Sequence, residues 1–152
     1  IVNVQGDEPL ITPDVIDELC QAFEEDPQLC MATVATPLQE SEYNEPSAVK
    51  VVLNKKGEAM YFSRSLIPYP RVQTPELPVY KHIGIYAYRR DFLLTYAALA
   101  PTPLERTESL EQLRALWHGY RINVWVSDHM PVPGVDTPED ALSMQAWFAK
   151  NA

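Results

Sequence analysis

Short apolar runs alternate along this chain with segments that carry helix-start signals, and this alternation most constrains its fold. Runs of strand length and composition occur at 1–4, 30–36, 49–53, 59–62, 83–88 and 122–126. Thr12-Pro13-Asp14 and Thr137-Pro138-Glu139 each combine an N-cap threonine, a first-turn proline and an early acid, which favours a helix start. Strands interleaved with helices predict an α/β fold with a mixed, mostly parallel sheet flanked by helices.

Local signals also place several boundaries. The first helix is expected to run from Thr12 to near Asp26, and a short one from 91 to 99. The runs at 49–53 and 59–62 surround a glycine turn and predict a hairpin. Thr107 is expected to cap a further helix, with Trp117 on its apolar side and Gly119 at its end.

Length and composition indicate a single domain spanning 1–152. The chain has 152 residues, of which 46% are hydrophobic, enough for a substantial core. No apolar stretch is long enough to span a bilayer and no signal segment is visible, so we expect a cytoplasmic protein. The net charge of −9 argues against nucleic acid or an anionic membrane as partner. A protein this acidic needs a metal ion or additional cations to hold a polyphosphate.

Two aspartates lie where ligands usually bind in α/β proteins. Asp7 follows the opening strand through a glycine turn, and Asp136 follows the last predicted strand. Ligands in open α/β sheets bind just beyond the carboxyl ends of strands. Two such carboxylates could meet over Mg²⁺, which prefers carboxylate and phosphate oxygens. An ordinary turn or capping role is the alternative for each.

Five further polar residues are candidates, each with a plainer explanation. Lys50 interrupts the apolar run 48–52, so its charge either reaches a cleft or extends to an edge. Arg64 suits carboxylate or phosphate recognition but could be solvated. His82 could be a packed or surface histidine, and Glu111 and Gln112 a solvated helix face. No glycine-rich phosphate loop with its lysine occurs in the sequence.

Several blocks together resemble one enzyme family, the 3-deoxy-manno-octulosonate cytidylyltransferases, or CMP-Kdo synthetases. The blocks lie in family order and cover nearly the whole chain. They are Asn3–Pro9, Ala48–Val52, Tyr61–Pro68, His82–Arg89, Leu104–Glu105, Leu110–Arg114 and Gly134–Asp140. The resemblance implies a Rossmann-like fold of the nucleotide-diphospho-sugar transferase type.

It also implies an activity: transfer of CMP from CTP to the anomeric hydroxyl of Kdo, an eight-carbon acid sugar. Pyrophosphate is released, and CMP-Kdo serves lipopolysaccharide biosynthesis in Gram-negative bacteria. By this resemblance Asp7 and Asp136 hold Mg²⁺, and family members are typically homodimers. The residues carried over to the Kdo site are Gln5, Arg64, His82, Tyr86, Glu111 and Gln112, with Lys50 nearby. Arg64 and His82 suit the sugar carboxylate, while Glu111 and Gln112 suit its hydroxyls.

The sequence departs from the family pattern in one respect. The family's basic nucleotide-binding loop, of the form Pro-Ala-Arg…Ser-Arg-Leu-Pro…Lys, has no counterpart here. We therefore expect an N-terminally incomplete enzyme whose nucleotide segment would precede Ile1, and expect the 152 residues alone to be inactive. Two alternatives stay open: a related nucleotidyltransferase for another acidic sugar, and an inactive truncated α/β domain that binds a sugar acid or metal or forms a subunit contact.

Overall fold

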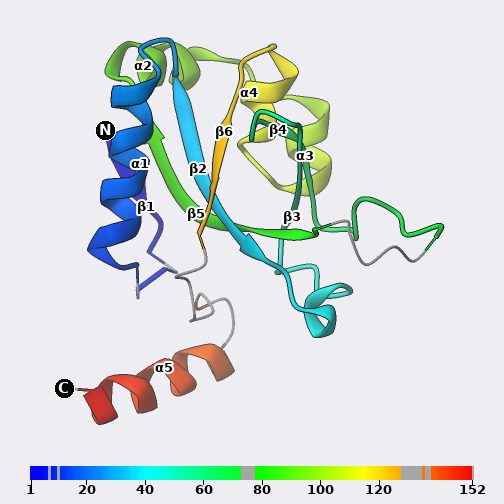
Figure 1. Ribbon diagram of the computed structural model, residues 1–152. Helices are drawn as coiled ribbons and strands as arrows, with labels where there is room; N and C mark the ends of the chain where they lie inside the picture. Colours follow the sequence, from blue (N-terminus) through cyan, green and yellow to red (C-terminus); the bar gives the residue numbers. More distant parts are fainter. Residues whose placement is uncertain (7, 10, 73–77, 128–134, 136–137, 152) are drawn as a thin grey trace.

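The computed structural model describes residues 1–6, 8–9, 11–72, 78–127, 135 and 138–151 (Figure 1). Six strands, five α-helices and one 3₁₀ turn are formed within these ranges. In chain order they are β1 (Val2–Val4), α1 (Pro13–Glu25), β2 (Met31–Pro37), η1 (Glu40–Glu42), β3 (Lys50–Leu53), β4 (Ala59–Ser63), β5 (Tyr80–Tyr88), α2 (Arg90–Ala98), α3 (Pro103–Glu108), α4 (Leu113–Trp117), β6 (Asn123–Val126) and α5 (Pro138–Asn151). None of the helices among the described residues is long and apolar enough to cross a membrane.

The strands form one mixed sheet in the order β4-β3-β5-β2-β6, with β1 also paired to β5. The α/β fold with a mixed sheet flanked by helices is confirmed. The expectation of a mostly parallel sheet is wrong for the described strands, because only β2 and β6 pair in parallel and the other four pairs are antiparallel. Parallel neighbours need a long crossover. Between β2 and β5 the described chain forms only η1 and the β3–β4 hairpin, so the strands return in opposite directions.

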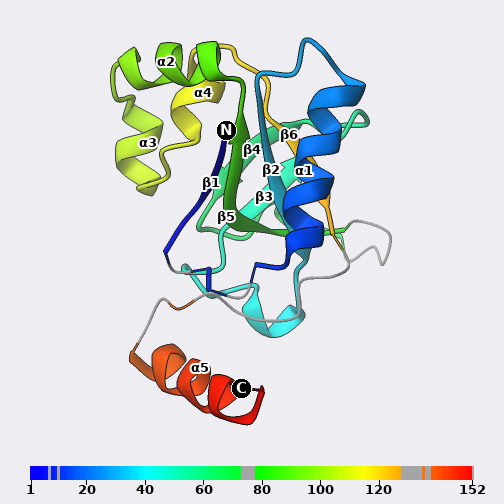
Figure 2. The same cartoon turned by 90° about the vertical axis from the view of Figure 1, so that its left-hand side faces the viewer.

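Helices cover both faces of the sheet. Helix α1 packs on one face, while α2, α3 and α4 lie on the other (Figures 1 and 2). Alternate side chains of β5 pack against the helices on the two faces, since successive side chains of a strand point to opposite faces. Ile83 and Ile85 pack with Val15 and Leu19 beneath α1, whereas Tyr86 belongs to the cluster under α2 and α4.

The helix signals proved accurate for α1 but not for the segment before α4. Thr12 is the N-cap residue of α1, although its hydroxyl makes no capping hydrogen bond. Thr107 does not cap a helix but lies inside α3, which is capped instead by Thr102. Helix α4 starts only at Leu113 and gives way to Gly119, whose φ of 81° confirms its predicted role at the helix end. Trp117 is 53% exposed, so its predicted place on the apolar side is wrong.

Thr102 forms a reciprocal capping box with Glu105. The Thr102 hydroxyl accepts from the Glu105 backbone N–H at 3.3 Å, and the Glu105 carboxylate accepts from the Thr102 N–H at 3.1 Å. Glu105 also accepts from Arg114 Nε at 2.9 Å. This ion pair joins α3 to α4 and so fixes the turn at 109–112 between them.

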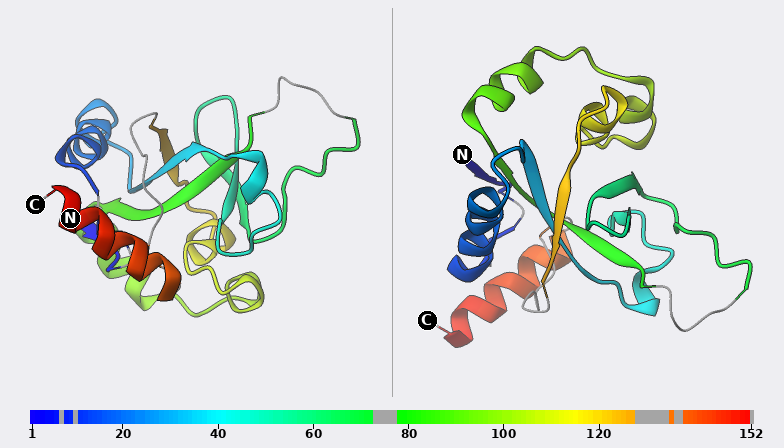
Figure 3. Two further views of the ribbon diagram at one scale, coloured as in Figure 1. Left: turned by 90° about the horizontal axis from the view of Figure 1, so that it is seen from below. Right: turned by 45° about the horizontal axis from the view of Figure 1, so that its top comes forward.

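An interruption along one edge of β5 positions the site. Strand β3 pairs with Tyr80 and Lys81, and β1 pairs with 85–87 on the same edge. In the interval, the His82 N–H donates to the Val49 carbonyl at 2.8 Å, and the Gln5 N–H donates to the Gly84 carbonyl at 3.1 Å. The end of β1 and the start of β3 therefore meet opposite 82–84. Seen from below in Figure 3, α5 lies nearer to the viewer than the sheet.

Candidate active site

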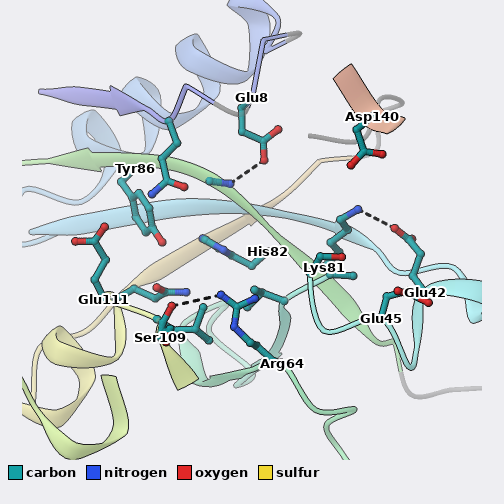
Figure 4. A pocket seen from close by; sticks show the side chains of 17 residues that line it. Glu8, Glu42, Glu45, Arg64, Lys81, His82, Tyr86, Ser109, Glu111 and Asp140 are labelled. Carbon is teal, nitrogen blue, oxygen red and sulfur yellow. Dashed lines mark hydrogen bonds and ion pairs between the residues drawn. The ribbon is translucent and has the colours of Figure 1, made fainter. Parts of the chain in front are cut away.

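A cavity of about 340 Å³ opens where β1 and β3 meet along β5 (Figure 4). Its walls come from the turn after β1, the segment before β3, the end of β4, the turn before α4 and the first turn of α5. Six predicted site residues line it: Gln5, Arg64, His82, Tyr86, Glu111 and Gln112. Lys50 is not among its lining residues, and Asp7 and Asp136 lie outside the described residues.

Arg64 is held at the cavity by backbone carbonyls. Its Nε donates to the Glu108 carbonyl at 2.8 Å, its Nη1 to Pro46 at 2.9 Å, and its Nη2 to Ser109 at 3.4 Å. A guanidinium carries five N–H groups. Within the described part of the chain two of them remain for a ligand. The side chain is thus oriented in advance, and no carboxylate of the described residues forms an ion pair with it.

Lys50 is completely buried and has a structural environment. Its ammonium donates to the Glu45 carbonyl at 2.6 Å and the Arg64 carbonyl at 3.1 Å. Burial is the largest effect on this ammonium and lowers the pKa of Lys50, against the attraction of Glu42 and Glu45. The two carbonyls belong to segments that form the cavity wall. Lys50 therefore acts behind the wall rather than in the cavity.

His82 is hydrogen-bonded to a buried threonine of the neighbouring strand. The Thr33 Oγ1 lies 2.9 Å from His82 Nε2, and the imidazole and Phe62 rings form a T-shaped pair with centroids 5.1 Å apart. Burial lowers the pKa of His82 to about 3, so the ring is neutral near pH 7. A neutral imidazole is a weak partner for the carboxylate that we assigned to it from the sequence.

The turn before α4 supplies two adjacent polar groups of different character. The Glu111 side chain is exposed, while its carbonyl accepts from Tyr96 Oη at 2.7 Å. Burial raises the pKa of Tyr96 to about 12, which keeps this hydroxyl a donor. Gln112 is only 2% exposed, and its Nε2 has no hydrogen-bond partner among the described residues. A buried, unpaired amide donor at a cavity wall is what a ligand oxygen would satisfy.

Gln5 lies across Gly84. A Cβ added at Gly84 would stand 2.5 Å from Gln5 Oε1, so the glycine makes room for this amide. The Gly84 N–H donates to Glu8 Oε1 at 3.3 Å, which brings a second side chain from the same turn to the cavity. The interruption in β5 pairing thus gathers Gln5 and Glu8 at one point.

The cavity also contains charged residues that the sequence did not single out. Lys81 and Glu42 form an ion pair at 2.7 Å, and Glu45 and Asp140 lie nearby (Figure 4). In the sequence these residues look like solvated charges. The only local sign that one of them could lie at a site was the position of Lys81 directly before His82 in a strand. With Glu8 and Glu111, five carboxylates and two cations of the described residues line the cavity. An anionic ligand here needs an additional positive charge.

The described residues contain no cluster of three His, Cys, Asp or Glu side chains that could hold a metal ion. The predicted ligands Asp7 and Asp136 lie outside the described residues. Their described neighbours Glu8 and Asp140 line the same cavity, and hard carboxylate oxygens predominate there. Carboxylate oxygens, which Mg²⁺ prefers as ligands, are thus present at the cavity, although the described residues alone do not assemble a metal site.

Known proteins resemble the chain closely. Residues 1–122 match the cytidylyltransferase family. A 3-deoxy-manno-octulosonate cytidylyltransferase of Syntrophotalea carbinolica is 50% identical over 96% of this chain and 62% of its own length. One of Polynucleobacter necessarius is 49% identical over 99% of this chain and 61% of its own length. The chain thus spans about three fifths of these relatives.

A solved structure agrees with these sequence similarities. It is a CMP:2-keto-3-deoxy-manno-octonic acid synthetase complexed with CTP, 44% identical, with a TM-score of 0.91. The alignment covers 99% of this chain and 62% of that protein. Fold, cavity and family match point the same way, and the chain belongs to the cytidylyltransferase family.

Proposed function

We propose that the protein transfers CMP from CTP to the anomeric hydroxyl of Kdo, giving CMP-Kdo and pyrophosphate. The observation that carries the proposal is the cavity at the β1–β3 junction, which gathers six residues expected at a Kdo site from distant parts of the sequence. The relatives that share about half of the residues carry the name of this activity.

The polar groups of the cavity suit a polyhydroxylated acid. Arg64 offers two N–H groups, and a guanidinium suits recognition of a carboxylate. Gln112 offers a buried unpaired donor, and Glu111 an acceptor for hydroxyl hydrogens. Their separation around the cavity would fix the sugar in one orientation.

In the reaction the anomeric oxygen attacks the α-phosphorus of CTP. The O–P bond forms as the bond from the α-phosphorus to the pyrophosphate oxygen breaks, and the hydroxyl proton leaves to solvent. For phosphoryl-type transfers positioning and charge neutralisation contribute most of the rate. Arg64, Glu111 and Gln112 would contribute the positioning, since each is anchored by its backbone or its neighbours.

We propose Asp7 and Asp136 as the ligands of a Mg²⁺ ion. When bound, Mg²⁺ would neutralise phosphate charge and lower the pKa of the attacking hydroxyl. Support comes from the excess of carboxylates around the cavity, to which both acids are close in sequence. The homodimer and the cytoplasmic location stay predictions.

The activity is tested with protein expressed from its coding sequence, including any residues upstream of Ile1. CTP, Mg²⁺ and Kdo are supplied and pyrophosphate release is followed, with a second acidic sugar in a parallel reaction. We expect pyrophosphate release that depends on Kdo. Release with the second sugar alone would favour the related nucleotidyltransferase, and no release with either would favour the inactive domain.

The assay has a matched pair of variants at the cavity. Gln112→Leu removes the unpaired amide donor and puts an apolar side chain of similar size in its place. Gln21→Leu makes the same change at an exposed glutamine of α1. We expect the first to raise the KM for Kdo and the second to leave it unchanged.

A further inference from the structure

Thr33 lies at the centre of a buried hydrogen-bond junction that no sequence signal indicated. Its side chain is fully buried in β2, on the sheet face that carries His82. The hydroxyl oxygen is 2.7 Å from the Ile85 carbonyl, 3.3 Å from the Ile83 carbonyl and 2.9 Å from His82 Nε2. All three partners belong to β5.

An irregularity in the strand pairing creates this junction. Thr33 pairs with Tyr86 and the next residue, Val34, pairs with Ile83, so one step along β2 matches three along β5. Such bulges re-aim side chains and are frequent beside active sites. Here the bulge places two β5 carbonyls and the His82 ring around one hydroxyl.

Counting hydrogens assigns the tautomer of His82. A threonine hydroxyl has one hydrogen to donate, and carbonyl oxygens only accept. The short contact to the Ile85 carbonyl takes that hydrogen. The third partner, His82 Nε2, must therefore donate to the Thr33 oxygen. In a neutral imidazole with its hydrogen on Nε2, the other nitrogen, Nδ1, is an acceptor.

We propose that Thr33 is a positioning residue that holds His82 as the Nε2–H tautomer, so that Nδ1 accepts a hydroxyl hydrogen from the ligand. The low pKa that burial gives His82 agrees with a neutral ring. Arg64 would then bind the carboxylate of the ligand, because its remaining N–H groups are donors. The assignment of the tautomer is independent of the proposed function; the hydroxyl partner rests on it.

A purely structural reading of Thr33 is that it satisfies the two carbonyls of the bulge. That reading predicts no particular state of His82. Two substitutions separate the alternatives. Thr33→Val keeps the shape but removes the hydroxyl, and Thr33→Ser keeps the hydroxyl but removes a methyl group.

The test is ¹⁵N NMR of the histidine rings near pH 7, in wild type and both variants, with His118 and His129 as internal references. We expect Nε2–H for His82 in the wild type and in Thr33→Ser. In Thr33→Val an Nε2–H would face a methyl group, so the proton should shift towards Nδ1, where water in the cavity can accept it. A wild-type ring protonated on Nδ1 or on both nitrogens would overturn the proposal, as would a Thr33→Val spectrum identical to wild type. The wild-type spectrum decides the tautomer even if Thr33→Val does not fold.

Kdo binding to the same proteins tests the role of Nδ1. We expect Thr33→Val to bind Kdo about tenfold more weakly, and Thr33→Ser to stay within about twofold of wild type. His82 should remain singly protonated in the Kdo complex. A doubly protonated ring in the complex would show pairing with the carboxylate and overturn the acceptor role. Absence of Kdo binding by the wild type would refute the proposed function while leaving the tautomer assignment intact.

Discussion

Replacing Lys50 by methionine should destabilise the fold far more than the same change at its cross-strand neighbour. Lys50 and Lys81 are register partners on β3 and β5, but only Lys50 is fully buried. Its two hydrogen bonds, to the carbonyls of Glu45 and Arg64, are each charge-assisted and so worth about 1.5–3 kcal/mol. Loss of the buried charge offsets part of this, because burial penalises the ammonium.

We therefore expect Lys50→Met to lower the free energy of unfolding by roughly 2–4 kcal/mol, since two carbonyls lose their partner. Lys81→Met removes an ion pair with Glu42 whose side chains are 21% and 29% exposed. Because this pair still touches solvent, we expect its loss to change the free energy of unfolding by only about 0.2–1 kcal/mol. Urea denaturation of the wild type and both variants measures the difference. Equal stability of the two variants would refute the structural role of Lys50.

Three further predictions concern the cavity. Asp136→Asn should abolish CMP-Kdo formation by the complete protein while leaving thermal unfolding unchanged; wild-type turnover would remove Asp136 from the metal site. Gly84→Ala should displace the Gln5 amide, because the new Cβ would stand 2.5 Å from Oε1, and weaken Kdo binding roughly three- to tenfold; unaltered affinity would exclude Gln5 as a contact. Because the folded pKa of His82 is about 3 against an ordinary 6.5, the unfolded chain binds more protons between these values. Wild-type stability should fall relative to His82→Gln as the pH drops from about 6.5 towards 3, by up to about 1.4 kcal/mol per unit, and parallel pH profiles would contradict this.

Much of the fold follows from local patterns, whereas strand direction does not. The limits of α1 are predictable because N-cap, proline and apolar spacing act within a few residues. The capping box of α3 follows a local pattern, Thr102 with Glu105 three residues later, but the helix start was expected only at Thr107. The antiparallel insertion of β5 between β3 and β2 depends on long-range pairing, which helix and strand signals do not encode.

For the site, the family resemblance predicted which residues belong to it, and the structure showed what surrounds each of them. Local sequence could not show that Lys50 is bonded to carbonyls behind the cavity wall, since those carbonyls come from two other segments. The same holds for Thr33, an unremarkable residue in an apolar run whose role depends on a bulge in another strand. When a buried polar side chain is hydrogen-bonded to backbone groups far away in the sequence, the residues around it in the sequence do not indicate this.

The central claim, that the cavity at the β1–β3 junction binds Kdo, is tested most directly by titrating Kdo into the ¹⁵N-labelled protein. We expect saturable amide shifts at cavity residues such as Gly84, Ser109 and Glu111. A second cavity of about 560 Å³, lined by Cys20 and Asp91 among others, should be unaffected. Shifts confined to that second cavity, or none at all, would contradict the account.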